Sequence, residues 1–357
     1  MDKKYTIKSL DSKNVFRLGR HLADFFPSPS IYGSEKYFHW KLSDNPIGVG
    51  LANIAETNSG DVASSATLTP KQAWLKGRLM PIAEIGDTYT GKQHLRKGLF
   101  LSLVKSNWEA ALASNYQFVY GTPNQNSLPG YIKKAQYAVV DELSMESFVA
   151  LCHVAPLLRK KIPTRLALII GGVSKILFRA WYRMLLGERK AAGMEIQDKK
   201  FKFLPVGWEE FIVRCSSQYD FILDRSRLVT EWRYIRNPHQ YRLVTLKEGG
   251  ILQGFAVYLI KEEGGIKRMN IVDLLVAQGT KPRCLALMNT MVDRAFKLNV
   301  ADVEIWCATR SKLRDAIRRS GFLRKGQINV IARCAVDVDI LGNLQDVHFC
   351  MGDTDNG

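Results

Sequence analysis

The pattern of apolar and polar residues predicts the same order of strands and helices twice along this chain, in two successive series. Each series contains strand-like stretches, a longer segment with helical periodicity, one more strand and a short helix that ends at an aromatic residue. In the first series we expect strands at 51–56, 80–85 and 118–120, a helix at 99–114 and a short helix ending at Tyr137. In the second series the same elements fall at 242–247, 269–274, 303–306 and 285–298, with the short helix ending at Phe322. This order predicts mixed α/β units, each built on a central sheet.

A tryptophan motif occurs once in each series and fixes the register between them. Residues 40–46 read WKLSDNP and residues 232–238 read WRYIRNP, so both fit W-[K/R]-x-x-x-N-P. Because the strands that follow each motif keep their order and nearly their spacing, we interpret the chain as a duplication. An aromatic residue followed by Asn-Pro suits packing plus a turn, so the motif itself is expected to be structural.

The segment between the two copies, residues 157–192, has apolar runs that basic residues interrupt. Lys175, Arg179 and Arg183 are spaced four apart, so on a helix they form one basic stripe. A membrane-spanning helix needs about 20 nearly uninterrupted apolar residues, which this segment lacks. A linker helix packed on the domains and a helix lying on a membrane surface both fit. The expected organisation is a domain at 1–150, a helical linker at 151–200, a second domain at 201–345 and a tail at 346–357.

Composition indicates a globular protein that stays in the cytoplasm. The chain has 357 residues, 46% of them hydrophobic, which is enough to bury a large core. Residues 1–10 lack the apolar core and cleavage site of a secretory signal. The six cysteines show no CxxC pair and no histidine at zinc spacing, so we expect neither a disulfide framework nor a metal site.

The chain carries a net charge of +17, from 51 Lys and Arg against 34 Asp and Glu. A positive field of this size gathers anions, so an anionic partner is expected. A phosphate-rich small molecule, nucleic acid and an anionic membrane surface all satisfy that expectation. Charge alone does not choose among them.

Residues 118–137, FVYGTPNQNSLPGYIKKAQY, resemble the fifth strand and the following helix of GNAT acyltransferases found among surface-polysaccharide genes. The likeness continues upstream through residues 84–90 and 96–100 and covers most of the amino-terminal half. The carboxy-terminal half resembles the same family mainly through the repeat. The resemblance implies an α/β fold with two tandem GNAT-like mixed-sheet domains joined by a basic helical linker.

Coenzyme A is the co-substrate that the resemblance implies, with no metal. GNAT proteins hold its pyrophosphate on backbone N–H groups where a strand turns into a helix, and residues 91–100 provide such a turn. The family pattern [Q/R]-x-x-G-x-[G/A] is matched in part, because Leu95 and Phe100 replace its ends. The equivalent turn at 278–284 contains Pro282 and a single glycine, so we assign coenzyme A to the first copy. The expected contact residues are Thr88, Tyr89, Thr90, Arg96, Lys97, Gly98, Leu99, Asn126 and Ser127.

Acylation of an amine requires a group that accepts a proton, and a carboxylate is the usual choice. Glu84 matches the general-base position of histone-type GNAT enzymes, although an ion pair with one of the many basic residues fits equally well. Asp87 is the second candidate. Strand alternation would place it on the opposite face unless a bulge at Gly86 redirects it.

The general acid is less clearly marked in the sequence. Many GNAT proteins protonate the departing thiolate with a tyrosine, and here Ile132 occupies that position with Tyr131 beside it. Tyr120 and Tyr131 are the candidates, and core packing is the alternative for both. Asn124, Asn126 and Ser127 either cap the following helix or contact the ligand. His94, in the phosphate turn, is expected to be exposed.

The resemblance implies an N-acyltransferase that acts on a nucleotide-linked deoxyamino sugar, such as a dTDP-3-amino-3,6-dideoxyhexose, with an acetyl or 3-hydroxybutanoyl donor. It implies no nucleic-acid partner and a monomer or dimer. A second interpretation is an enzyme similar to FemX, which attaches amino acids from charged tRNA to cell-wall precursors, because the high charge suits tRNA. The Arg96-Lys97-Gly98 turn argues against it. A basic binding module without catalysis is the third interpretation, but the basic residues are spread along the chain.

Overall fold

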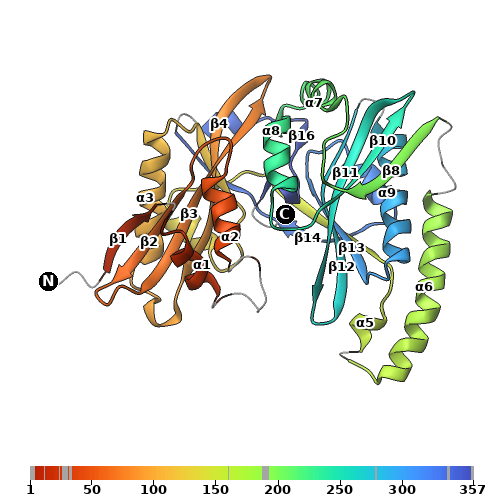
Figure 1. Cartoon of the computed structure of the whole chain (residues 1–357), viewed down its shortest axis with the longest axis horizontal. Coiled ribbons are helices and arrows are strands. Elements are labelled where there is room, and N and C mark those ends of the chain that lie inside the picture. The colour runs from red at the N-terminus through yellow and green to blue at the C-terminus, as the bar shows by residue number, and fades with distance from the viewer. Residues whose placement is uncertain are drawn as a thin grey trace. The chain divides into compact units, whose positions relative to one another are not determined.

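The structure is a computed structural model that describes residues 5–11, 13–23, 25, 31, 34–159, 161–186, 193–277, 280–335 and 338–354 (Figure 1). Contacts divide the chain into two compact units. Unit 1 consists of Met1–Asp141, Ile222–His239 and Asn329–Asn343. Unit 2 consists of Glu142–Phe221, Gln240–Ile328 and Leu344–Gly357. Each unit is therefore assembled from three separate stretches of sequence.

Unit 1 is built on a sheet with the strand order β1-β2-β3-β4-β5-β15-β6. Neighbouring strands are antiparallel except β4 and β5, which are parallel. The strands are β1 (Tyr5–Leu10), β2 (Leu51–Thr57), β3 (Val62–Leu75), β4 (Arg78–Thr90), β5 (Phe118–Gly121), β6 (Ala138–Val139) and β15 (Ile331–Cys334), and β9 (Phe221–Leu223) pairs with β3. The helices are α1 (Phe16–Ala23), α2 (Glu35–Phe38), η2 (His39–Ser43), η3 (Lys92–His94), α3 (Leu99–Ala113), α4 (Leu128–Lys134), α8 (Arg227–Thr230), η4 (Glu231–Ile235) and η5 (Val338–Leu341).

Unit 2 has the strand order β14-β7-β13-β12-β11-β10-β8. Here β12 and β13 are the parallel pair, and the other neighbours are antiparallel. The strands are β7 (Met145–Leu151), β8 (Met194–Lys200), β10 (Arg242–Glu248), β11 (Ile251–Glu263), β12 (Ile266–Val276), β13 (Asp302–Ala308), β14 (Leu323–Ile328) and β16 (Val347–His348). The helices are α5 (Ala155–Leu158), α6 (Thr164–Leu186), α7 (Trp208–Ser216), α9 (Thr280–Lys297), α10 (Arg314–Arg319) and η6 (Met351–Asp353).

The two sheets exchange one strand each. In chain order β7 follows β6, yet it pairs in unit 2 between β13 and β14. Likewise β15 follows β14, yet it pairs in unit 1 between β5 and β6. The two strand orders are therefore equivalent, and each sheet is completed by a strand from the other half of the sequence.

Helix α3 covers one face of the unit 1 sheet because its apolar residues recur at helical spacing. Leu103, Val104 and Trp108 are buried on that side, where the core also contains Ala83 and Val119. The opposite face packs against α1, α2 and η2, whose buried side chains form a second core with Ala52 of β2. The even-numbered residues of the first part of β4 face this second layer.

The predicted α/β fold class and two mixed sheets are confirmed. The expected strands correspond to β2, β4, β5, β10, β12 and β13, and the expected helices to α3, α4, α9 and α10. The two short helices end earlier than expected, at Lys134 and Arg319, so that Tyr137 and Phe322 follow them and do not end them. The predicted helix at 285–298 begins earlier, at Thr280, because Pro282 lies in the first turn, where a missing N–H costs nothing. The predicted boundaries at 150, 200 and 345 describe continuous segments, whereas the units are discontinuous.

The linker forms α5, α6 and β8 where the structure describes it; residues 160 and 187–192 lie outside the described part. A search of the described helices finds none with the length and apolar character needed to cross a membrane.

Candidate functional site

The central feature of unit 1 is the point where β4 and β5 separate. The two strands pair only at Ala83–Val119 and Glu84–Tyr120, and β4 then continues beside β3 as far as Thr90. Gly121 lies at the point of separation, where a Cβ atom would be 3.1 Å from the carbonyl oxygen of Ile85. Within the described residues, β5 therefore does not cover the edge of β4 beyond Glu84. An extended ligand can add to a strand edge of this kind.

A β-bulge in β4 lies next to this edge. Asp87 and Thr88 together oppose a single residue of β3, and Asp87 has a φ of 45°. The Asp87 carboxylate accepts hydrogen bonds from Lys41 Nζ at 2.5 Å and from Thr67 Oγ1 at 2.8 Å. Thr67 faces the same side of the sheet as Glu84, so the bulge brings Asp87 to that side too. The bulge considered at Gly86 is present one residue further along.

Glu84 is buried and forms an ion pair. Its Oε2 atom is 3.2 Å from Nζ of Lys71, and the two side chains are 1% and 8% exposed. The ammonium group also lies 5.5 Å from the centroid of the Trp232 ring. The predicted pairing of Glu84 with a basic residue is thus observed, and the base role stays a prediction. The ion pair with Lys71 makes Glu84 part of a buried polar centre on this face of the sheet.

The two candidate tyrosines lie on different faces of the sheet. Tyr120 is fully buried and neighbours Glu84 in the parallel register, so both side chains face the same layer. Tyr131 belongs to the α3 layer, and its hydroxyl is 2.9 Å from Oγ1 of Thr88. Ile132, the family position, is 40% exposed. The structure therefore turns Tyr131, and not Ile132, toward the uncovered edge of β4.

The turn before α3 has the backbone shape expected of an anion site. Arg96 and Gly98 have φ values of 61° and 78°, and no described side chain caps the helix. The first N–H groups of a helix lack acceptors within it, and the helix dipole adds positive potential. The side chains of Arg96 and Lys97 are exposed, and a Cβ added to Gly98 would meet no atom within 4 Å. The turn is open to a ligand.

Of two further residues in this region, His94 departs from the expected exposure, and Asn124 follows one of its two alternatives, the helix cap. His94 is half-buried, because its Nδ1 atom lies 3.0 Å from the Tyr5 hydroxyl. At the start of α4, Asn124 provides the cap by accepting hydrogen bonds from the backbone N–H groups of Asn126 and Ser127, both at 3.0 Å. Asn126 itself is exposed.

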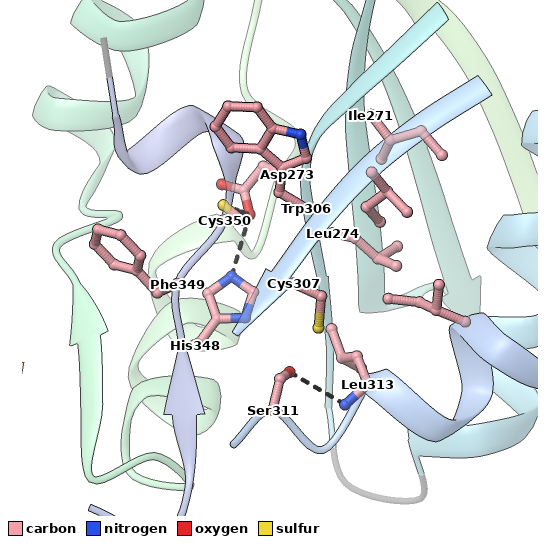
Figure 2. Close-up of a pocket in the computed structure, with 12 residues that line it drawn as sticks. Ile271, Asp273, Leu274, Trp306, Cys307, Ser311, Leu313, His348, Phe349 and Cys350 are labelled. Carbon is pink, nitrogen blue, oxygen red and sulfur yellow. Dashed lines mark hydrogen bonds and ion pairs between the residues drawn. The ribbon is translucent and has the colours of Figure 1, made fainter. Parts of the chain in front are cut away.

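In unit 2 the repeat places Asp273 where unit 1 has Glu84, and its surroundings differ (Figure 2). Asp273 Oδ1 lies 3.2 Å from His348 Nε2 and 3.5 Å from Cys350 Sγ, and the thiol also lies 3.2 Å from Asp353 Oδ2. The adjoining cavity has about 10 Å³, room for about one water molecule. The cavity as described has no room for an acyl group.

The donor atoms of Asp273, His348 and Cys350 lie within 4.8 Å of one another. Carboxylate, imidazole and thiolate are all ligands that zinc accepts. The sequence pattern predicted no metal site and gave no sign of this group, because Asp273 is far from the other two residues in sequence. Each of the three takes part in the hydrogen bonds given above, which account for their burial without an ion.

All six cysteines are free thiols. Cys307, which also lines the small cavity, is buried, and burial raises its pKa to about 12. It is therefore a neutral thiol at ordinary pH. The expectation of no disulfide framework agrees with this finding.

Similarity to known proteins is found in structure and not in sequence. No family model matches the chain, and no curated protein matches its sequence. A structure of Saccharomyces cerevisiae N-myristoyltransferase with bound myristoyl-CoA superimposes with a TM-score of 0.64 at 12% identity, over 98% of this chain and 90% of that one. A probable N-acyltransferase from Enterococcus faecalis V583 gives 0.60 at 13% identity, over 92% and 72%.

A GCN5-related N-acetyltransferase from Anabaena variabilis ATCC 29413 also gives a TM-score of 0.60 at 13% identity, over 92% of this chain and 73% of that one. At such low identity these likenesses establish the fold. The chain has the fold of tandem GNAT proteins.

Proposed function

We propose that this chain is an acyl-CoA-dependent N-acyltransferase in which unit 1 binds the thioester. The observation that carries the proposal is the uncapped start of α3, with left-handed backbone at Arg96 and Gly98 and exposed cations at Arg96 and Lys97. A helix start with this geometry suits a diphosphate, because its N–H groups and dipole both point at the anion. The bound myristoyl-CoA in the structurally similar yeast enzyme supports this choice of ligand.

The uncovered edge of β4 is the proposed track for the pantetheine arm. Thr88, Tyr89 and Thr90 belong to this edge, downstream of the two β4–β5 pairs. An arm that starts at the α3 turn and follows β4 toward Glu84 brings the thioester to the point where the strands separate. Asn126 and Ser127, at the start of α4, are proposed to contact the same arm, and Leu99 to contribute its backbone N–H to the diphosphate.

In the proposed reaction an uncharged amine nitrogen attacks the thioester carbonyl carbon. The C–N bond forms, the C–S bond breaks, and the nitrogen gives up one proton. Glu84 accepts that proton, directly or through one water, while Lys71 holds its carboxylate in place. The departing thiolate takes a proton from Tyr131, whose hydroxyl lies beside Thr88, with Tyr120 as the second candidate.

Asp87 has a different proposed part from Glu84. Its carboxylate is held by Lys41 of the first tryptophan motif and by Thr67 of β3. It therefore fixes the bulge that separates the edge of β4 from β5, and we assign it a positioning role in place of proton transfer.

The proposed acceptor is the amino group of a nucleotide-linked deoxyamino sugar. This assignment is supported by the sequence resemblance of residues 84–137 to acyltransferases of surface polysaccharides. The charge of +17 supports it too, because both reactants then carry a diphosphate. The same charge favours the second candidate, a FemX-like transfer from charged tRNA.

Two measurements test these proposals. Thermal unfolding is followed with coenzyme A, acetyl-CoA or tRNA, and stabilisation by the coenzymes alone is expected. Turnover is then measured as free thiol released from acetyl- or 3-hydroxybutanoyl-CoA in the presence of a panel of nucleotide amino sugars. Stabilisation by tRNA alone would replace the first candidate with the second. A protein that none of the three ligands stabilises would overturn both.

A further inference from the structure

The longest helix of unit 2 leaves one apolar face uncovered. Helix α6 (Thr164–Leu186) runs beside α9 in Figure 1. Eight apolar side chains on α6 are 48–71% exposed, and at 3.6 residues per turn six of them fall within about 100° of its circumference; Leu168 and Trp181 lie outside this arc. We call these six the α6 apolar face: Leu166, Ile169, Val173, Ile176, Leu177 and Met184.

The opposite side of α6 packs on unit 2, apart from Leu168 near its start, which is 48% exposed. Gly171 approaches α5 so closely that a Cβ atom there would lie 2.3 Å from Cβ of Ala155. Tyr182 is buried, with its ring centroid 6.2 Å from that of Phe296 in α9. Lys175 Nζ bonds to Oδ1 of Asn299. The exposed face is therefore presented by an anchored helix.

Cations follow one long edge of the apolar face. Arg165, Arg179 and Arg183 are exposed and lie on the same side of the helix. No acidic residue occurs anywhere between Glu146 and Glu188. Trp181, 48% exposed, lies at the other edge of the apolar face. An apolar stripe with cations on one border and an amphipathic ring on the other is the pattern of a helix lying in a membrane interface.

We propose that α6 is a peripheral membrane-binding helix whose occupant is an anionic lipid surface. The apolar face inserts into the acyl chains, and Arg165, Arg179 and Arg183 reach the headgroup phosphates. The helix is about 35 Å long and stays parallel to the surface, because its other side is committed to α5 and α9.

Charge argues against a second copy of this chain as the occupant. Two α6 helices packed face to face would bring like charges together with no acidic partner on either. An anionic surface instead satisfies the charges. Each cation close to it adds about 1 kcal/mol, a factor of about five in partitioning. The proposal does not depend on the activity of unit 1.

The test is co-sedimentation of the full chain with vesicles of phosphatidylcholine alone or with phosphatidylglycerol added. We expect binding at least tenfold tighter with the anionic lipid, weakening as salt is raised. I169Q/I176Q should lower binding at least tenfold, and R179E/R183E should abolish the preference for anionic lipid. Trp181 fluorescence, isolated by subtracting the signal of W181F, should be quenched by brominated acyl chains.

Matched controls separate the helix from general effects. V213Q removes an apolar side chain of α7 that is 70% exposed, and K76E/R78E makes the same charge change at the exposed turn between β3 and β4 of unit 1. Both should bind vesicles like the wild type, and all variants should keep its unfolding temperature. Absence of vesicle binding, or equal losses in the controls, would overturn the proposal. A further contradicting result would be a protein that does not bind vesicles and forms a dimer that I169Q/I176Q dissociates. In that case a second copy of this chain would be the occupant of the α6 apolar face.

Discussion

Trp40 and Trp232 each donate an indole hydrogen bond to the main-chain carbonyl oxygen of the other, at 2.7 and 2.9 Å. Their rings are stacked with centroids 5.0 Å apart. Both lie at the second position of a π-helical turn, in η2 and η4. Each indole N–H therefore finds its hydrogen-bond acceptor in the other copy of the motif. The duplicated sequence is thus a self-complementary pair at the core of unit 1.

Replacing Trp232 by Phe should lower the free energy of unfolding by about 2–4 kcal/mol, because it removes a buried donor and part of the stack. W40F should act similarly. The double variant should cost less than the sum by about 0.5–1.5 kcal/mol, since each change already breaks the same contact. Urea denaturation of the four proteins measures this coupling, and strictly additive losses would contradict it.

Gly98→Ala should weaken coenzyme A binding about tenfold. The added Cβ strains a left-handed residue and projects into the space proposed for the diphosphate. Gly77→Ala is the matched control, because Gly77 has a φ of 77° and equally open surroundings but lies in the turn between β3 and β4. Isothermal titration of both variants should show a loss for Gly98 only. Equal losses would mean that the α3 turn is not the binding site.

Glu84→Gln should reduce turnover by about 10²- to 10⁴-fold and leave coenzyme A affinity unchanged, because the variant cannot accept the proton of the amine. The repeat offers its own control in Asp273→Asn. That change should lower the free energy of unfolding by about 1–3 kcal/mol, through the bonds to His348 and Cys350, and keep turnover within about threefold. The reverse pattern, measured by thiol release and urea denaturation, would move the chemistry to unit 2.

The ion pairs of Glu146, on the exchanged strand β7, should make the stability of the fold depend on pH. A hydrogen bond from Arg314, with Arg324 at 2.8 Å, holds the pKa of Glu146 below its ordinary value of 4.5, although burial opposes this. Because the pKa of Glu146 is lowered in the folded state, its ionised carboxylate stabilises the fold fully above about pH 4.5. This stabilisation is lost as the pH falls through the lowered pKa.

Glu146→Gln should therefore cost about 1–2 kcal/mol at pH 7, and the cost should be smaller at pH 3, because the loss begins once the pH falls below about 4.5. Denaturation at both pH values measures the difference. Glu109→Gln, which removes an exposed partner of Lys105 on α3, should have little effect at either pH. A Glu146→Gln cost that does not change between pH 7 and pH 3 would contradict the assigned ion pair.

The sequence predicts the elements of this fold well because their periodicity is local. The repeated tryptophan motif and the strands after it identified both sheets, and the apolar positions Leu103, Val104 and Trp108 located α3. The strand exchange was not predictable. As isolated sequences β7 and β15 are ordinary strands, and nothing in their residues says which sheet they join.

The backbone geometry of the candidate site was predictable where it follows from turn chemistry, and the roles of its residues stay predictions. Gly98 and Arg96 adopt the left-handed backbone that a phosphate turn needs. The residue of α4 that faces inward differs by one position from the sequence prediction. The family resemblance places Ile132 at the position of the general acid, whereas the packing of α4 turns Tyr131 inward. Contacts between distant segments, such as Lys71 with Trp232 or Asp273 with His348, leave no local signal.

The reciprocal exchange of β7 and β15 makes each half of the sequence dependent on the other for folding. A fragment ending near residue 141 would lack the central strand between β5 and β6, and would expose an unpaired edge that invites aggregation. Both sheets close only after strands far apart in the chain have met, which makes their completion a late and slow event during synthesis. Nearly the whole polypeptide must therefore leave the ribosome before the sheet of unit 1 can be completed.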